Sequence, residues 1–220
     1  FGVDEGDLIA EDASYAAGSS SILANASGSG NNDNNKIAYF TPAMGGLKAG
    51  VSFEDSGANA NANTDRTEWG ASYSMAMGDA NVVIEFNQGD GNNATAGQLN
   101  TTHTNYGATV TSGPISVLVS HGEQKDATSD MKGDGISVKY DMGDGMYIAG
   151  MAMSSNDTEQ STAALGDEKY ESAVAEIGYT VAPGLTAKVT HIDYDYTAGG
   201  ATTATNDNGS ATRLTLTASF

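Results

Sequence analysis

The stretch Ala211-Thr-Arg-Leu-Thr-Leu-Thr-Ala-Ser-Phe220 carries an apolar residue at every second position from Leu214 to Phe220. The residues between them, such as Arg213 and Thr215, are polar. Successive side chains of a β-strand point to opposite faces, so this alternation predicts a strand with one apolar face and one polar face.

The same alternation recurs along the chain. Apolar residues share one face, and small, polar or charged residues share the other, in the segments 47–54, 66–77, 82–87, 105–111 and 136–141. A soluble barrel would have the polar face outside, and the alternation alone does not distinguish the two arrangements. From the sorting of the connections described next and the terminal Phe220, we interpret the apolar face as outward and the polar face as the lining of a water-filled interior.

The connections between the predicted strands alternate between tight and long. Tight turns rich in Gly, Pro and Asp pair 36–41 with 47–55, 66–77 with 81–88, 104–111 with 115–122, 133–141 with 146–154, and 169–180 with 185–196. Longer polar segments follow these hairpins at 56–65, 89–103, 123–132, 155–168 and 197–210. Short periplasmic turns and long extracellular loops are typical of outer-membrane proteins. The sequence therefore predicts an all-β fold, an antiparallel transmembrane β-barrel.

Composition excludes several other classes of protein. No apolar run approaches the roughly 20 residues of a transmembrane helix, and the mean hydropathy of -0.33 suits alternating strands with polar loops. A net charge of -19 argues against nucleic-acid binding, which needs a basic surface, and favours attraction of cations. The chain begins at Phe1 without an initiator Met or a signal peptide, so we expect a piece of a mature secreted protein.

Aromatic residues concentrate near the predicted strand ends, as the interfacial belts of a membrane barrel require. The belt predicted at the short turns comprises Tyr39, Phe40, Tyr140, Tyr147, Tyr179 and Phe220, and the belt predicted at the long loops comprises Phe53, Trp69, Phe86 and Tyr170.

Two motifs resemble the general diffusion porins of Gram-negative bacteria, particularly the alphaproteobacterial kind. Phe220 is similar to the terminal aromatic residue that the barrel-assembly machinery of that family reads, and Lys36–Phe53 resembles its strand, Pro-x-x-Gly-Gly turn, strand unit. Members of the family are 16-stranded barrels that assemble as trimers. Counting back from Phe220 gives about eleven strands, and bacterial single-chain barrels have an even number, so we expect the first strands to lie outside this chain.

The resemblance also implies a role for residues 1–35. In the family, the third extracellular loop folds into the lumen between the fifth and sixth strands, and this segment precedes the strand that would be the sixth. The implied constriction residues are Asp4, Glu5, Asp7, Glu11 and Asp12, and the implied basic residues of the facing barrel wall are Lys48, Arg66, Lys139, Lys188 and Arg213. A solvated surface loop is the alternative interpretation of this acidic segment.

Taken with the resemblance, these features predict a porin of the bacterial outer membrane. Its expected function is passive diffusion of small hydrophilic solutes through a water-filled, cation-preferring channel. The resemblance implies a homotrimer, together with contacts to outer-membrane lipids, lipopolysaccharide and the barrel-assembly machinery.

Enzyme motifs are absent from the sequence: there is no Gly-x-Ser-x-Gly, phosphate-binding loop, His-Glu-x-x-His or complete EF-hand loop. We therefore expect a protein that is not an enzyme and has no cofactor beyond Ca²⁺ held loosely by the acidic pieces 89–92 and 141–145. Two alternatives stay open. One is a secreted or cell-surface structural β-protein such as an adhesin or a fibre, and the other is a small complete barrel in which residues 1–35 supply a twelfth strand.

Overall fold

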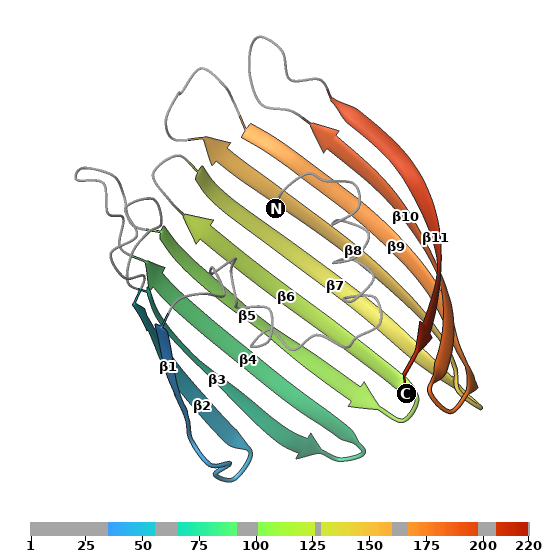
Figure 1. Cartoon of the computed structure of the whole chain (residues 1–220), viewed down its shortest axis with the longest axis horizontal. Coiled ribbons are helices and arrows are strands. Elements are labelled where there is room, and N and C mark those ends of the chain that lie inside the picture. The colour runs from blue at the N-terminus through green and yellow to red at the C-terminus, as the bar shows by residue number, and fades with distance from the viewer. Residues whose placement is uncertain are drawn as a thin grey trace.

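The described residues form one antiparallel sheet in which each strand pairs with the next strand along the chain (Figure 1). The computed structural model describes residues 35–55, 66–91, 101–125, 129–159, 167–197 and 206–219. Its eleven strands are β1 Asn35–Phe40, β2 Leu47–Asp55, β3 Arg66–Met77, β4 Ala80–Gly91, β5 Thr101–Ser112, β6 Ile115–Lys125, β7 Ser129–Gly143, β8 Met146–Glu159, β9 Asp167–Ala182, β10 Leu185–Thr197 and β11 Asp207–Ala218.

Tight turns close the hairpins at one end of this sheet, as predicted. Only two residues separate β3 from β4, β5 from β6, β7 from β8 and β9 from β10. Gly78, Gly113 and Gly184 in these turns have φ values of 62°, 55° and 78°. Glycine adopts this left-handed conformation without a steric penalty, and two-residue hairpins that follow the twist of their strands require it.

The strands run further toward the loop end than the alternation indicated. The predicted connection 123–132 was wrong in length, because the ladder continues to the pair Lys125↔Asp130 and leaves only 126–128 between β6 and β7. Beyond the apolar stretch both faces of these strands are polar. The pattern of side chains therefore no longer marks the strand, although the backbone pairing persists.

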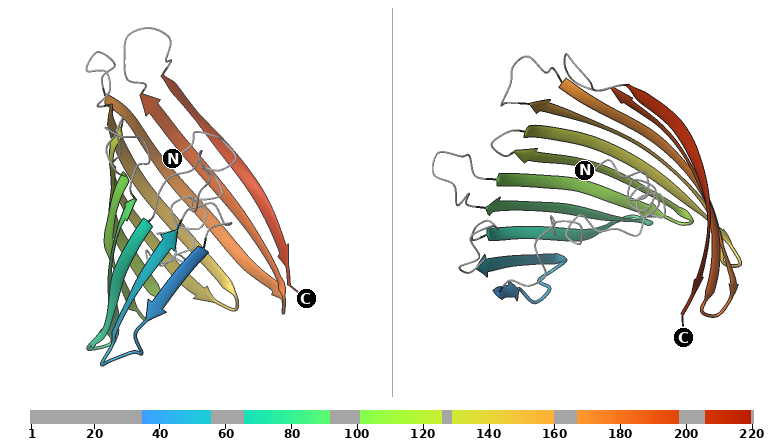
Figure 2. Two further views of the ribbon diagram at one scale, coloured as in Figure 1. Left: turned by 60° about the vertical axis from the view of Figure 1, so that its left-hand side comes forward. Right: turned by 45° about the horizontal axis from the view of Figure 1, so that its top comes forward.

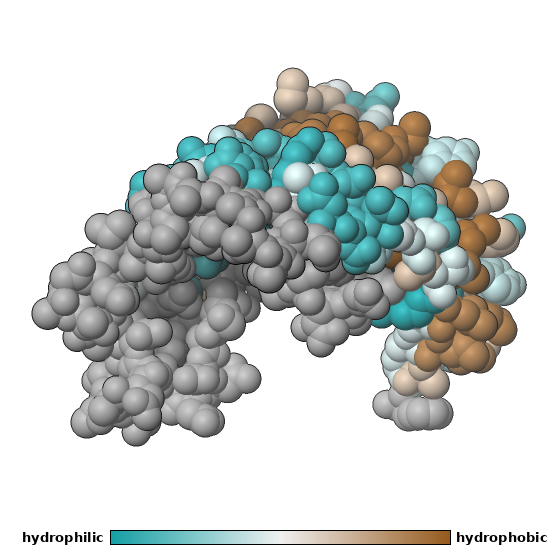
Figure 3. Space-filling model, turned by 90° about the horizontal axis from the view of Figure 1, so that it is seen from above, coloured by the Kyte–Doolittle hydropathy of each residue, from teal (hydrophilic) through white to brown (hydrophobic). Residues whose placement is uncertain are grey.

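The sheet is arched, and its two faces differ in chemistry (Figure 2). Ile84, Ala108, Val119 and Ile136 are register neighbours on the face opposite the polar side chains of the same strands. Hydrophobic residues gather along the convex side of the arch (Figure 3). Within the described residues, no helix is long and apolar enough to cross a membrane.

The registers also show how far the strands tilt. Trp69 of β3 aligns through successive partners with Thr197 of β10. On β3, Trp69 is the outward apolar residue nearest the loop end. On β10 the corresponding residue is Val189, which lies eight residues closer to the turn end than Thr197. Eight residues, about 26 Å, over seven strand spacings, about 34 Å, give a tilt near 40°. A tilt of this size is the geometry of a closed barrel.

The predicted aromatic belts are partly wrong. Tyr39, Tyr140 and Tyr179 point outward near the turns, and Trp69 and Phe86 point outward near the loops with ring centroids 4.9 Å apart.

Three aromatic side chains assigned to the belts lie on the concave face instead. Phe40 covers Gly50, Tyr147 covers Gly178, and Tyr170 stacks on Tyr194 at a centroid distance of 6.4 Å. Their position along the strand was predicted correctly. The face on which a strand residue lies, however, alternates from one residue to the next, and the belt criterion considered only the distance from the strand end.

Paired charges replace the apolar side chains on the outward face toward the loops. Outward acid–base pairs of the described residues include His121–Asp134 at 2.8 Å, His121–Glu123 at 3.3 Å, Lys132–Glu123 at 3.7 Å, Lys125–Asp130 at 3.3 Å, Lys169–Glu171 at 2.8 Å and His191–Asp193 at 3.5 Å, the histidine pairs being charged when the imidazole is protonated. These pairs bound the apolar band on the side of the long connections.

Lysine at the outward position 84 tests the assignment of faces. Ile84→Lys should lower the free energy of unfolding from lipid vesicles by about 2–4 kcal/mol, because its ammonium group enters hydrocarbon near the middle of the apolar band. Val83→Lys, on the concave face of the same strand, should cost much less. Urea titration of the full-length protein, followed by tryptophan fluorescence, measures both variants. Equal losses would contradict the assignment.

Candidate channel lining

One row of concave side chains crosses β7 to β11. Backbone registers align one concave-facing residue from each of these five strands. The charged row, which includes the polar neighbours of these residues toward the turns, comprises Lys139, Tyr147, Glu176, Lys188, Thr190 and Arg213.

Glu176 is the centre of the charged row. Its side chain has no exposed surface, and both carboxylate oxygens are engaged. Tyr147 Oη donates to Oε1 at 2.7 Å, Thr190 Oγ1 donates to Oε2 at 2.6 Å, and Lys188 Nζ lies 3.3 Å from Oε2. A buried carboxylate is tolerated only when hydrogen bonds and a counter-charge replace its hydration, and this site supplies both.

Tyr147 connects Glu176 to Lys139. A Cβ atom on Gly178 would collide with the ring of Tyr147, so the glycine lets the ring lie flat against the wall. Lys139 Nζ sits 4.6 Å from the centroid of that ring, within the range of a cation–π interaction. Three strands therefore hold this part of the row in one arrangement.

The charged row has an excess of positive charge. Lys139, Lys188 and Arg213 are cationic, whereas Glu176 is the one carboxylate in the row as defined. Because Glu176 is buried and Lys188 keeps 22% of its side chain exposed, the positive charge is the part that reaches solvent. The row can attract anionic groups and repel cations, and no arrangement in it resembles a nucleophile with its base.

The concave face of β3 and β4 carries charge of the opposite sign. Glu68 accepts a hydrogen bond from Ser52 Oγ at 3.4 Å, and Glu85 is 9% exposed on the same face. Beside them, Asn105 donates to Asn87 Oδ1 at 2.9 Å. The described wall thus has acidic and amide side chains on β3 to β5, whereas the charged row on β7 to β11 is mainly basic.

The structure brings three of the five predicted basic wall residues together. Lys139, Lys188 and Arg213 belong to the charged row. Lys48 shares the concave face, but it lies on β2 opposite Ser72 of β3, far along the sheet from the row. Arg66 begins β3 opposite Glu54, and its side chain lies outside the described residues.

The remaining predicted site residues cannot be placed, since they lie outside the described residues. They are the acidic run Asp4, Glu5, Asp7, Glu11 and Asp12, and the terminal Phe220.

Sequence reasoning did not identify Glu176 or Thr190 as site residues, and it placed Tyr147 in an aromatic belt. A single Glu on the polar face of a strand is ordinary, and the pairing of Glu176 with Thr190 depends on the register between β9 and β10. The alternation of side chains along β8 could have placed Tyr147 on the concave face, because Tyr147, Ala149 and Met151 share one face of this strand.

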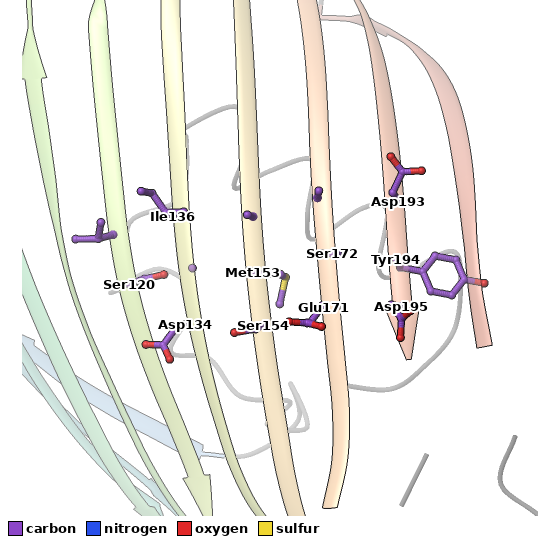
Figure 4. A pocket seen from close by; sticks show the side chains of 14 residues that line it. Ser120, Asp134, Ile136, Met153, Ser154, Glu171, Ser172, Asp193, Tyr194 and Asp195 are labelled. Carbon is purple, nitrogen blue, oxygen red and sulfur yellow. The ribbon is translucent and has the colours of Figure 1, made fainter. Parts of the chain in front are cut away.

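A separate open depression of about 700 Å³ lies over β6 to β10 (Figure 4). Ala152 and Ala173 belong to its lining, and both have their side chains on the convex face between Ile136 and Asp193. It is therefore a shallow hollow on the outer surface, where small residues lie between larger ones, and not part of the channel lining.

Among the described residues, no group of three or more His, Asp or Glu side chains is arranged to hold a metal ion. Loose binding of Ca²⁺ by the acidic pieces 89–92 and 141–145 stays a prediction.

Several solved structures are similar to this chain. They include Acinetobacter baumannii OccAB4 (TM-score 0.68, 14% identity, 84% of this chain and 52% of that chain), Pseudomonas aeruginosa OprD (0.66, 14%, 83% and 59%) and P. aeruginosa OpdK crystallised with vanillate (0.66, 13%, 84% and 55%). No curated protein sequence matches the chain. The chain spans about half the length of these structural relatives. The predicted fold class, an antiparallel barrel wall like that of 16-stranded outer-membrane porins, is confirmed.

The arched sheet, its apolar convex face and its polar concave face thus define an outer-membrane β-barrel protein. The model of the Gram-negative porin family matches residues 4–220, so the chain belongs to this family. Its location is the bacterial outer membrane, as predicted.

Removing the carboxylate of Glu176 tests the charged row. Glu176→Ala should lower the free energy of unfolding by about 3–5 kcal/mol, since it leaves a partly buried lysine without its counter-charge. Glu171→Ala is the matched control, because Glu171 lies on the same strand, is about half exposed and pairs with Lys169 on the outer face. The control should cost about 0–1 kcal/mol. Urea titration in lipid vesicles compares them, and similar losses would mean that Glu176 is not a buried ion-pair centre.

Proposed function

We propose that the protein forms a water-filled channel for passive diffusion of small hydrophilic solutes and is not an enzyme. The observation that carries the proposal is the division of one sheet into an apolar convex face and a polar, charged concave face. Such a wall suits lipid on one side and water on the other. A fibre or adhesin has no need of an apolar band bounded by charge pairs, so this alternative is less well supported.

We also propose that the channel prefers cations. The net charge of -19 and the five carboxylates between Asp4 and Asp12 support this proposal, provided that the acidic run lies in the channel. The charged row then supplies positive charge on the facing wall. Carboxylates and cations across a narrow passage create a transverse field, and the excess of carboxylates favours cations near the constriction.

Assembly is part of the same proposal. We propose a homotrimer in contact with outer-membrane lipids and lipopolysaccharide, with Phe220 recognised by the barrel-assembly machinery. The ion pairs above the apolar band support contact with lipopolysaccharide, because they present both signs of charge outward at the loop end.

Reconstitution tests the channel itself. The full-length protein, extracted in detergent and added to planar bilayers, should produce discrete conductance steps, and liposomes that contain it should admit small sugars. On unheated gels it should migrate as a compact β-rich species that heating converts to a slower one. A monodisperse protein that is soluble without detergent and forms no conductance steps would contradict the proposal.

Charge neutralisation tests the cation preference. Replacing Asp4, Glu5, Asp7, Glu11 and Asp12 with Asn or Gln should shift the reversal potential in a salt gradient toward lower cation preference. The shift should be largest at low salt, because about 0.1 M salt screens fixed charges beyond about 10 Å.

A variant with the same number of neutralised outward carboxylates is the matched control for this measurement. The control positions are Glu123, Asp134, Glu171, Asp193 and Asp195. Their neutralisation should leave the reversal potential nearly unchanged. If both variants shift it equally, overall charge sets the preference, and the acidic run does not line the constriction.

A further inference from the structure

Aromatic rings on the concave face lie opposite glycines. Four of the described rings on this face have a glycine as a direct register partner on a neighbouring strand. A Cβ atom on any of these glycines would lie 3.0 Å or less from the ring that faces it. The four ring–glycine pairs are Phe40–Gly50, His103–Gly89, Tyr147–Gly178 and Tyr194–Gly209.

The convex face lacks this arrangement within the described part of the chain. A ring that points into lipid can extend away from the sheet, whereas a ring that points into a channel takes up part of its cross-section. The glycines therefore lie where a ring has to be kept against the wall. The convex Phe, Tyr and Trp residues, none of which has a glycine as register partner among the described residues, are Tyr39, Phe53, Trp69, Tyr73, Phe86, Tyr106, Tyr140 and Tyr179.

The pair Tyr147–Gly178 lies at the charged row and is the most closely packed of those with a tyrosine. A Cβ atom on Gly178 would lie 2.6 Å from Tyr147 Oη and closer still to the ring carbons Cε1 and Cζ. Tyr147 Oη donates to Glu176 at 2.7 Å, and Lys139 Nζ lies 4.6 Å from the ring centroid. Because the wall beside the ring is occupied, a side chain at position 178 would push the ring away from the wall and toward the lumen.

We propose that the glycines opposite concave rings set the free width of the channel, and that Gly178 does so at the charged row through the position of the Tyr147 ring. The proposal rests on the proposed channel function and deepens it, because these residues then decide how large a solute passes. With glycine at position 178, the ring lies flat against β9. With a larger residue there, the ring stands off the wall and narrows the passage beside Lys139.

A purely structural role is the alternative for such a pair, because a ring that covers a glycine also packs against the neighbouring strand and stabilises the sheet. That role predicts a loss of stability without a change in the conductance of the assembled channel. Conductance and the size limit for solutes therefore separate the two roles.

Gly178→Ala in the full-length protein tests the proposal. Its single-channel conductance in planar bilayers should be lower than that of the wild type. Liposomes that contain it should admit a monosaccharide more slowly, and a disaccharide more slowly again relative to the wild type. The same substitution in a Tyr147→Ala background should cause no loss, because no ring is left to displace. Residues in contact act non-additively in this way, whereas independent sites do not.

Gly150→Ala is the matched control, because Gly150 lies in β8 beside the same row but on the convex face. A Cβ atom there would make an ordinary contact of 3.7 Å with the carbonyl oxygen of Val174. No ring is its register partner, so this variant should conduct like the wild type.

Gly89→Ala keeps the proposal testable if Gly178→Ala does not assemble. A Cβ atom at position 89 would lie 2.7 Å from Nε2 of His103 and closer still to Cε1. Conductance should again fall, and His103→Ala should abolish the fall. For whichever glycine variant assembles, wild-type conductance, or an equal loss without the ring, would overturn the proposal while leaving the channel intact. Absence of conductance from the wild-type protein would instead count against the channel.

Discussion

Backbone hydrogen bonding constrains every other feature of this structure. In hydrocarbon, an unpaired backbone N–H or C=O group cannot form a hydrogen bond with water. Each strand must therefore pair with its neighbours along its whole length in the membrane. Among the described strands, sequential antiparallel pairing meets this requirement for β2 to β10, and turns of two residues close four of the hairpins. The side chains are then free to divide by parity, apolar toward lipid and polar toward water.

The concave wall shows what this division permits. Because the backbone is satisfied by the ladder, side chains on the inner face need not form a conventional core. They include the buried ion-pair centre at Glu176 and, two residues away along the strands, an apolar patch of Met151, Val174 and Ile192. Both features sit on β8 to β10, so one small part of the wall combines a fixed charge arrangement with an apolar surface.

Strand positions and faces could be predicted from the sequence because the alternation is local. Strand ends could not, since Lys125 and Asp130 pair where both faces are polar and the alternation vanishes. The inward direction of Lys139, Lys188 and Arg213 followed from parity alone. Their grouping around Glu176 did not, because it depends on the registers of four strand pairs. Tyr147 was misplaced because its position near a turn outweighed its parity.

The tilt of the strands changes how the charged row meets a solute. The row follows the registers, which run perpendicular to the strands, and so it is not level in the membrane. Over the four strand spacings from Lys139 to Arg213, a tilt near 40° produces a height difference of about 12 Å. An anionic group moving along the pore would therefore meet the cations at successive depths and would never face all of them at a single depth.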